Sequence, residues 1–274
     1  CIQGIALFYR YIVYEEKALM FFDYFYTLVL AIIQGITEFI PISSSSHLII
    51  FSKLANFNYQ SLEVDVGLHL GSLLAIIIYF KSDLIKINKN KNLILLFIIG
   101  SLPLFIVGFL IYYSGFINYL RDIKVIGWST LIFGILLYIA DKSKINKNLN
   151  KDLTIKNIII IGLSQCIALI PGVSRSGIII TSSRFINFNR YESSKISFYL
   201  SIPALAGASF LGLQDIIKNN LEFNLIILIA SILSFIFSYL TIKYFLIYVK
   251  KYSLNIFVYY RIFIALLILA ITYG

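Results

Sequence analysis

Two segments decide the fold of this chain: QGITEFIPISSSSH, from Gln34 to His47, and QCIALIPGVSRSG, from Gln165 to Gly177. Each is a polar segment with a proline, inside an otherwise apolar stretch. The first carries a glutamate, a histidine and a run of serines, and the second carries an arginine between two serines. Polar and ionisable groups at membrane depth are costly and usually mark a functional site.

The composition is that of an integral membrane protein. Of the 274 residues, 59% are hydrophobic and 13% are charged, whereas soluble domains carry about 25% charged residues. The formal net charge of +10 lies in loops, where it indicates topology and attraction to lipid headgroups. No nucleic-acid-binding motif accompanies it, so we expect no nucleic-acid partner. Cys1 and Cys166 provide neither a disulfide framework nor a CxxC metal site.

The N-terminal residues stand apart from the rest of the chain. Met20 is the only methionine, and the first long apolar stretch follows it directly. We expect residues 1–19 to be an N-terminal tail or an over-extended translation start, with an interfacial helix as the alternative.

Apolar stretches of about 20 residues predict membrane-spanning helices. Two shorter stretches, 24–41 and 157–171, stop at a proline and are followed by further short apolar stretches at 47–56 and 177–186. We expect these to form two re-entrant helix pairs, because non-helical backbone at membrane depth must be buried in protein or line a cavity. Full spans are predicted at 65–80, 93–113, 123–141, 195–214, 224–248 and 255–273.

Loop charges predict the orientation. Loops 81–92, 141–156 and 184–195 and the segment 243–251 are rich in lysine and arginine, whereas the intervening loops are balanced. The positive-inside rule places the basic loops in the cytoplasm. The first re-entrant pair then enters from outside and the second from the cytoplasm.

The two halves of the chain have the same layout, a re-entrant pair followed by three spans. Broken helices that meet near the membrane midplane are typical of inverted-topology repeats. We therefore predict an all-α integral membrane protein with six transmembrane helices and two re-entrant helix pairs. The repeats are 20–141 and 157–274, a basic cytoplasmic linker at 142–156 joins them, and the polar tips of both pairs converge on one site.

The first polar segment offers proton, nucleophile and cation chemistry. Gln34 and Glu38 are four residues apart and share a helix face, so Glu38 is a candidate ligand for a divalent cation, with Gln34 beside it. A serine between Glu38 and His47 is a candidate nucleophile with His47 as its base. Ser45 and Ser46 stand where a helix begins and are more simply interpreted as caps.

The second polar segment offers an anion site. Gly172 permits close backbone approach, and Ser174, Arg175 and Ser176 precede an apolar helix. Backbone N–H groups at a helix N-terminus together with serine hydroxyls bind anions, and a guanidinium group matches phosphate geometry. Two opposed helix N-termini and one arginine suit a diphosphate.

Each candidate also has a structural interpretation. His47 is alternatively an interfacial histidine bonded to backbone, and Glu38 is alternatively a hydrogen-bonding group between helices. Arg175 is alternatively a snorkelling arginine, which its glycine and serine neighbours disfavour. For His69, in a full span, packing or hydrogen bonding is favoured over catalysis.

With these motifs the chain resembles the undecaprenyl-diphosphate phosphatase family, also called the bacitracin-resistance protein family. That family carries an (E/Q)xxxE motif that runs into Pro-x-Ser-Ser and a histidine, and a PGxSRSxxT motif. The segments VGLHLGSLLA and YYRIFIALL add to the resemblance, which covers residues 20–274. The first motif position is Gln34 rather than glutamate, and Ile179 stands at the threonine position, with Thr181 two residues further on. The matching positions are Gln34, Glu38, Pro41, Ser43, Ser44 and His47, then Pro171, Gly172, Ser174, Arg175 and Ser176.

The resemblance implies hydrolysis of undecaprenyl diphosphate to the monophosphate and inorganic phosphate, which recycles the lipid carrier for cell-wall synthesis and confers bacitracin resistance. It implies a multi-pass protein of the bacterial plasma membrane, surrounded by membrane lipids, with a site that opens toward the outer face. A divalent cation, Mg²⁺ or Ca²⁺, is expected at Glu38 and Gln34. Ser44 is the expected nucleophile and His47 its base or the proton donor to the leaving group. The expected substrate-binding residues are Gln34, Ser43, Gly172, Ser174 and Ser176, with Arg175 stabilising the transferring phosphoryl group.

Other functions and mechanisms fit the same pattern. A polyprenyl-phosphate flippase or small-anion transporter would use the same inverted-repeat site. An activated water or His47 would replace Ser44 as nucleophile. Vanadium-haloperoxidase-like lipid phosphatases require a histidine after the Ser-Arg segment, and no histidine follows Ser174 in this chain. The sequence leaves open whether two copies form a homodimer.

Overall fold

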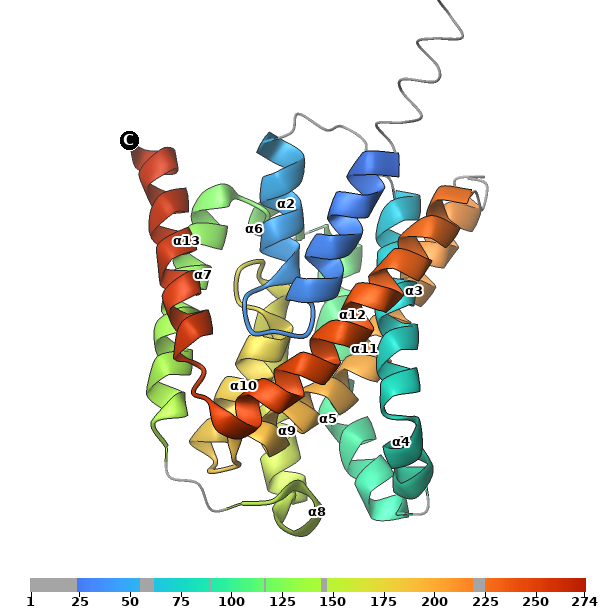
Figure 1. Ribbon diagram of the computed structural model, residues 1–274, viewed down its shortest axis with the longest axis vertical. Coiled ribbons are helices and arrows are strands. Elements are labelled where there is room, and N and C mark those ends of the chain that lie inside the picture. The colour runs from blue at the N-terminus through green and yellow to red at the C-terminus, as the bar shows by residue number, and fades with distance from the viewer. Residues whose placement is uncertain (1–23, 55–61, 89, 116, 144–146, 219–224) are drawn as a thin grey trace, which may run out of the picture.

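The computed structural model describes residues 24–54, 62–88, 90–115, 117–143, 147–218 and 225–274 as a bundle of helices (Figure 1). Within these ranges the extended backbone pairing is limited to one isolated bridge between Lys147 and Phe188. The predicted all-α class is confirmed. The tail predicted at 1–19 lies outside the described residues.

Five helices in the described ranges are long and apolar enough to cross a membrane. A bent pair, α3 (Leu62–Tyr79) and α4 (Lys81–Asn88), adds a sixth span if its two helices, which meet at 70°, are taken together. The six predicted spans thus correspond to α3 and to the five long helices. These are α5 (Lys91–Ser114), α7 (Ile123–Asp141), α11 (Arg190–Lys218), α12 (Leu225–Lys251) and α13 (Asn255–Tyr273).

Two predicted loop regions contain more helix than expected. Segment 81–92 was expected to be a loop, but most of it forms α4, because Leu84 and Ile87 pack against the core. Helix α11 begins at Arg190 rather than at 195. Its start is stabilised by Asn189, whose side-chain oxygen accepts a hydrogen bond from the backbone N–H of Glu192 at 2.8 Å, as N-cap residues do.

Both predicted re-entrant segments are short helices broken near a proline. The first consists of the helix Tyr24–Thr37 and α2 (Ser44–Leu54). The second consists of α9 (Ile155–Gln165), the short η1 (Cys166–Leu169) and α10 (Arg175–Phe185). Figure 1 shows the first pair in the upper half of the bundle and α9 and α10 in the lower half, so that their tips meet in the middle. The opposed entry agrees with an inverted repeat, which stays a prediction for the chain as a whole.

The two tips are built into the main hydrophobic core. Phe39 of the first tip and Val173 of the second are both fully buried there, together with Phe198 of α11. The Phe39 and Phe198 rings pack edge to face, with centroids 5.5 Å apart, an arrangement that aromatic pairs prefer. The non-helical backbone of the tips is therefore enclosed by protein, as the membrane requires.

Small residues bring the re-entrant helices and the spans close together. A Cβ atom added to Gly162 of α9 would collide with the Gly100 carbonyl of α5. Helices α3 and α12 are joined by Ser72, whose hydroxyl lies 3.1 Å from Ser234 Oγ and 3.0 Å from Ser238 Oγ. Interfaces of small and hydroxyl residues are typical of helix packing in membranes.

The ends of the bundle separate the basic segments from the others. Helix α4 and the short α8 (Leu149–Asp152) lie at one end, whereas the short α6 (Ile117–Leu120) and the C-terminus lie at the opposite end (Figure 1). The described parts of the lysine-rich segments 81–92 and 141–156 therefore share one end of the bundle, in agreement with the loop charges.

Candidate active site

An ion pair joins the two tips in the middle of the bundle. Arg175 Nη2 lies 2.8 Å from Glu38 Oε1, although the two residues are 137 positions apart in the chain. The Glu38 side chain is 9% exposed and the Arg175 side chain is 14% exposed. The other terminal nitrogen of Arg175, Nη1, donates to the Ser201 carbonyl of α11 at 3.2 Å. The tips converge as the sequence predicts.

The second carboxylate oxygen of Glu38 accepts two more hydrogen bonds. Ser44 Oγ donates to Glu38 Oε2 at 2.6 Å, and Gln34 Nε2 donates to the same oxygen at 3.1 Å. Ser44 is the first residue of α2, and Gln34 lies one helical turn before Glu38. A serine hydroxyl that donates to a carboxylate already has a proton acceptor in place, which is the arrangement that an activated nucleophile needs.

Ser43 and Ser174 both have a positive φ angle at the same point of the two tips. Each stands directly before a helix, with φ angles of 75° and 70°. The hydroxyl of Ser174 caps α10 by accepting from Gly177 N at 3.1 Å, whereas the Ser43 hydroxyl lies 3.3 Å from Ser45 Oγ and 3.0 Å from Ser46 Oγ. Positive φ is uncommon for serine, and such residues cluster at functional sites. The likeness of the two serines supports the repeat locally.

Hydrogen bonds and close packing hold the tips against each other. Gly172 N donates to Ser43 Oγ at 3.3 Å, and Ser176 Oγ donates to the Ile40 carbonyl at 2.9 Å. Gly172 has a φ of 97°, and a Cβ atom there would collide with Ser129 Oγ of α7. Glycine is therefore required at this position by both conformation and space.

His47 lies at the site but does not act on Ser44 in this arrangement. Its Nδ1 lies 2.6 Å from the Ser43 carbonyl, and its Nε2 lies 2.6 Å from Tyr260 Oη. Both ring nitrogens of His47 have other partners here and Glu38 receives the Ser44 hydroxyl, so the role of His47 as base of Ser44 or as proton donor to the leaving group stays a prediction. A role of His47 in a later proton transfer stays open to proposal.

Two neighbouring residues of α13 complete the site, and sequence reasoning did not identify them. The Tyr260 ring stacks on the His47 ring, with centroids 5.6 Å apart and planes at 8°. Arg261 is buried and donates to backbone carbonyls in both tips. The available signal was an arginine inside the apolar segment YYRIFIALL, since an ionisable residue at membrane depth usually has a function.

Other candidates serve packing and local hydrogen bonding. Thr181 Oγ1 donates to the Gly177 carbonyl of its own helix at 2.7 Å. Ile179, at the threonine position of the family motif, is fully buried in the core. His69 Nδ1 lies 2.7 Å from the Asp65 carbonyl, in line with the structural interpretation that the sequence favours.

The oxygen atoms around Glu38 provide a partial ligand set for a hard cation. The described residues contain no group of three or more His, Cys, Asp or Glu side chains suited to a metal ion. Gln34 Oε1, however, is buried and has no hydrogen-bond partner among these residues, and such atoms usually find one. Mg²⁺ is commonly bound by one or two carboxylates together with substrate phosphates and water. Glu38 and Gln34 therefore fit a cation that the substrate helps to hold.

The arrangement can bind an anion and transfer a phosphoryl group. The N-termini of α2 and α10 face each other across the tips, and N–H groups at helix N-termini bind phosphate. Arg175 adds charge and hydrogen-bond donors, and Ser44 with Glu38 adds a hydroxyl with an acceptor. Fold and site together define a polytopic membrane protein in which two broken helix pairs bring a hydroxyl, a carboxylate and a guanidinium together inside the bundle.

Comparison with known proteins places this chain in one family. The model of the bacitracin resistance protein BacA family matches residues 27–267, and the chain belongs to that family. An undecaprenyl-diphosphatase of Pelagibacter ubique is 52% identical over 93% of this chain and 100% of its own length. An undecaprenyl-diphosphatase of Elusimicrobium minutum is 38% identical over 88% of this chain and 95% of its own length. An undecaprenyl-diphosphatase 4 of Bacillus thuringiensis is 35% identical over 89% of this chain and 96% of its own length.

Proposed function

We propose that this protein hydrolyses undecaprenyl diphosphate to undecaprenyl phosphate and inorganic phosphate. The relatives named undecaprenyl-diphosphatase align over nearly their whole length. The observation that carries the proposal is the cluster of Ser44, Glu38 and Arg175, in which a hydroxyl and a guanidinium both bind one carboxylate between two helix N-termini. The product is the lipid carrier of cell-wall synthesis, and its return to use explains the resistance to bacitracin after which the family is described.

The reaction begins at Ser44. Its Oγ attacks the terminal phosphorus of the diphosphate, and its proton passes to Glu38, 2.6 Å away. As the bond between Oγ and phosphorus forms, the bond from phosphorus to the bridging oxygen breaks, and undecaprenyl phosphate leaves. Water then hydrolyses the phosphoserine and releases inorganic phosphate.

Arg175 changes partner during this sequence. When substrate binds, its guanidinium exchanges the Glu38 carboxylate for phosphate oxygens, to which it donates in the forked geometry that phosphate accepts. Fixed donors aimed at the transferring phosphoryl group stabilise the charge of the transition state. The Glu38 oxygen that faces Ser44, Oε2, stays in place to accept the Ser44 proton.

His47 serves the second half of the reaction. Its Nδ1 is held by the Ser43 carbonyl, and the hydrogen bond at one ring nitrogen decides which nitrogen carries the proton. Nε2, which lies 2.6 Å from Tyr260 Oη, accepts a proton of the water that attacks phosphoserine once that water replaces the Tyr260 hydroxyl as its partner. Tyr260 orients the ring for this step.

A divalent cation, Mg²⁺ or Ca²⁺, completes the site in this proposal. Glu38 and Gln34 would hold it, which gives the orphaned Gln34 Oε1 a partner. When bound, the cation would neutralise phosphate oxygens and supply Lewis-acid stabilisation.

The prenyl chain lies in an apolar groove between α5 and α11. A cavity of about 450 Å³ is lined there by Leu169 of the second tip and by small residues of both helices. Ala204 lines the cavity and follows Ser201, whose carbonyl binds Arg175, by one helical turn. Phe105 lines both this cavity and a neighbouring one of about 320 Å³. A methyl-branched hydrocarbon chain that leaves the phosphate site past Ala204 would enter this apolar groove.

The orientation follows from loop charge. The basic end of the bundle faces the cytoplasm of a bacterial plasma membrane, since lysine and arginine are retained there. The first re-entrant pair then opens the site toward the outer face, where the lipid diphosphate is released by cell-wall synthesis. Tyr112 and Asp215, hydrogen-bonded at 2.7 Å, mark the outer end of the chain groove.

Phosphate release from purified protein in detergent tests the function. We expect release from undecaprenyl diphosphate and from farnesyl diphosphate that needs a divalent cation and is lost in Arg175→Ala and in Glu38→Ala. Arg121→Ala and Asp122→Asn, changes of the same charge type at exposed positions outside the tips and the chain groove, serve as matched controls with normal release. If well-folded wild-type protein releases no phosphate under any ionic condition, the proposal is refuted. Lipid transport is then favoured, because a transporter would not hydrolyse the diphosphate in detergent.

A further inference from the structure

Arg261 of α13 lies between the two tips and bonds to both. It is 1% exposed. Nη1 donates to the Pro41 carbonyl of the first tip at 3.3 Å. Nη2 donates to the Gly172 and Val173 carbonyls of the second tip at 2.9 Å and 3.0 Å. Nε donates to the Thr130 carbonyl of α7 at 3.3 Å. One side chain therefore connects both tips to two spans.

This connection has a fixed geometry. The guanidinium group is planar, and its five N–H donors point in set directions. Pro41 precedes Ser44 by three residues, and Val173 precedes Arg175 by two, so the bonded carbonyls adjoin the reacting groups on each side. A change in the distance between these carbonyls moves the nucleophile relative to the guanidinium that meets the phosphate.

The charge of Arg261 is not compensated within the described residues. No carboxylate there lies within the 4 Å of an ion pair with Arg261, and its hydrogen-bond partners are neutral carbonyls. A buried charge is costly when it lacks a partner. Because Glu38 and Arg175 neutralise each other, the tips carry one positive charge in excess, which an anionic substrate offsets.

We propose that Arg261 is a positioning residue that holds the two tips in catalytic register and that its excess charge draws the diphosphate into the site. The proposal rests on the phosphatase function proposed above. It assigns two separable effects to one side chain: the fork sets the geometry of Ser44 and Arg175, and the charge sets the affinity for the anion.

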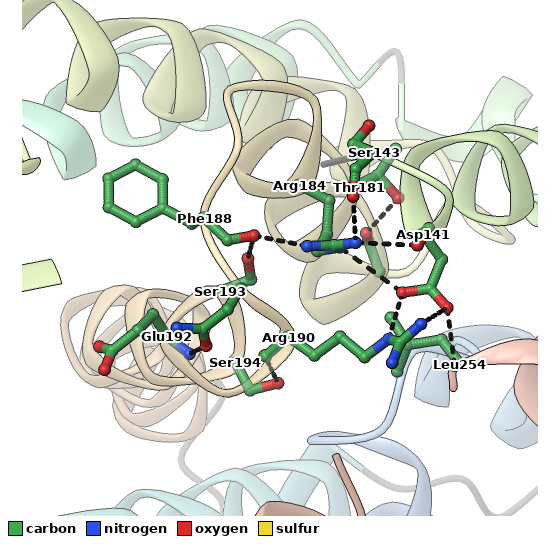
Figure 2. Close-up of polar contacts among 12 residues, drawn as sticks. Asp141, Ser143, Thr181, Arg184, Phe188, Arg190, Glu192, Ser193, Ser194 and Leu254 are labelled. Carbon is green, nitrogen blue, oxygen red and sulfur yellow. Dashed lines mark hydrogen bonds and ion pairs between the residues drawn. The ribbon is translucent and has the colours of Figure 1, made fainter. Parts of the chain in front are cut away.

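A second buried arginine provides a matched control. Arg184, at the C-terminal end of α10, donates to the carbonyls of Phe188, Asp141 and Ser143 at 2.8, 2.8 and 2.9 Å (Figure 2). Its charge is compensated by the Asp141 carboxylate, which also pairs with Arg190. Arg184 thus has the burial and the carbonyl contacts of Arg261 but lies at the basic end of the bundle, away from the tips.

Steady-state kinetics of Arg261→Lys, Arg261→Gln and Arg184→Gln with farnesyl diphosphate test the proposal, with rates divided by the amount of monodisperse folded protein. For Arg261→Gln we expect kcat to fall by about 10²-fold, the scale of a misplacement near 1 Å. Its KM should rise by about 10-fold through loss of the charge. For Arg261→Lys, which keeps the charge without the fork, KM should stay near the wild-type value while kcat stays low. Arg184→Gln should lower thermal stability while the folded fraction keeps both constants.

The outcomes separate the two proposals. A wild-type kcat in folded Arg261→Lys or Arg261→Gln would overturn the positioning role, and an unchanged KM in Arg261→Gln would overturn the role of the charge. If Arg261→Gln does not fold, Arg261→Lys decides the role of the fork, and the salt dependence of farnesyl diphosphate binding to the wild type decides the role of the charge. Loss of hydrolysis in the wild type itself would refute the phosphatase function. In that case the binding of farnesyl diphosphate to the same variants still tests the role of the charge. Equal affinities of wild type and Arg261→Gln would overturn that role.

Discussion

Replacing Glu38 by glutamine removes one charge of the ion pair that joins the tips and leaves Arg175 charged without its carboxylate. The two side chains are only 9% and 14% exposed, so solvent screens the remaining charge weakly. Breaking a buried pair from one side costs about 3–5 kcal/mol. We expect Glu38→Gln to lower the free energy of unfolding by about 3 kcal/mol, at the lower end of that range because the pair retains some exposure.

The double variant Glu38→Gln with Arg175→Gln should recover most of this stability. It removes both charges at once, and a buried pair replaced on both sides is close to neutral. We expect a net loss of about 1 kcal/mol, the scale of one imperfectly replaced hydrogen bond. The stability change of the double variant should therefore differ by about 2 kcal/mol or more from the sum of the single changes. Hydrolysis should be absent in all three variants, because Arg175 binds the phosphate and Glu38 accepts the Ser44 proton in the proposed mechanism.

The measurement combines unfolding with phosphate release in one detergent. At about 2–4 °C per kcal/mol, Glu38→Gln should lower Tm by about 6–12 °C and the double variant by about 2–4 °C. Asp215→Asn is the control, since its carboxylate accepts from Tyr112 Oη at an exposed position and exposed changes stay within about 0.5 kcal/mol. Additive losses would show that the two charges do not interact as the 2.8 Å contact requires. Recovery of hydrolysis in the double variant would remove both residues from the mechanism.

Three further predictions concern the nucleophile, the cation and the chain groove. Ser44→Ala should lower hydrolysis by about 10³-fold or more and abolish the trapping of labelled phosphate on the protein; trapping that persists would move the nucleophile elsewhere. Chelation should stop hydrolysis reversibly. Gln34→Leu should raise the Mg²⁺ concentration needed for half-maximal rate by about 10-fold, the lower end of the range for a lost contact near a metal. An unchanged Mg²⁺ requirement would remove Gln34 from the ligand set. Ala208→Trp fills the groove between α5 and α11. It should raise KM for undecaprenyl diphosphate by about 10-fold or more, since each CH₂ that loses its buried place forfeits about 0.8 kcal/mol. KM for the shorter farnesyl diphosphate should stay nearly unchanged. Thr241→Trp, in the groove beside the first tip, is its control, and equal effects on both substrates would reject this path for the chain.

The sequence predicts the spans and the breaks because membrane physics acts on single segments. Apolar length and proline position need no tertiary information, and α7 and α13 occur at the predicted residues. Segment 81–92 was not predicted as helical because its lysines indicate a loop. Its helix is stabilised by the packing of Leu84 and Ile87 against the core, which the local sequence does not show.

The site was predictable where one helix carries its chemistry and not where distant helices supply partners. Gln34 and Glu38 lie four residues apart, and the sequence alone places them together. Tyr260 meets His47 across 213 residues, and no local pattern in the sequence shows that contact. Arg261 resembles any arginine near the end of a span until the three-dimensional fold shows which carbonyls it binds.

The division of the site between the two halves of the chain has a consequence for biosynthesis. Glu38 is made 137 residues before Arg175, an interval of roughly 7–27 s at ordinary rates of synthesis. During that time the first tip holds a carboxylate in the membrane without its cationic partner. The last helix then supplies Tyr260 and Arg261. If these residues act as proposed, a ribosome that stops early leaves an inert fragment, and hydrolysis begins only when the final span has been inserted.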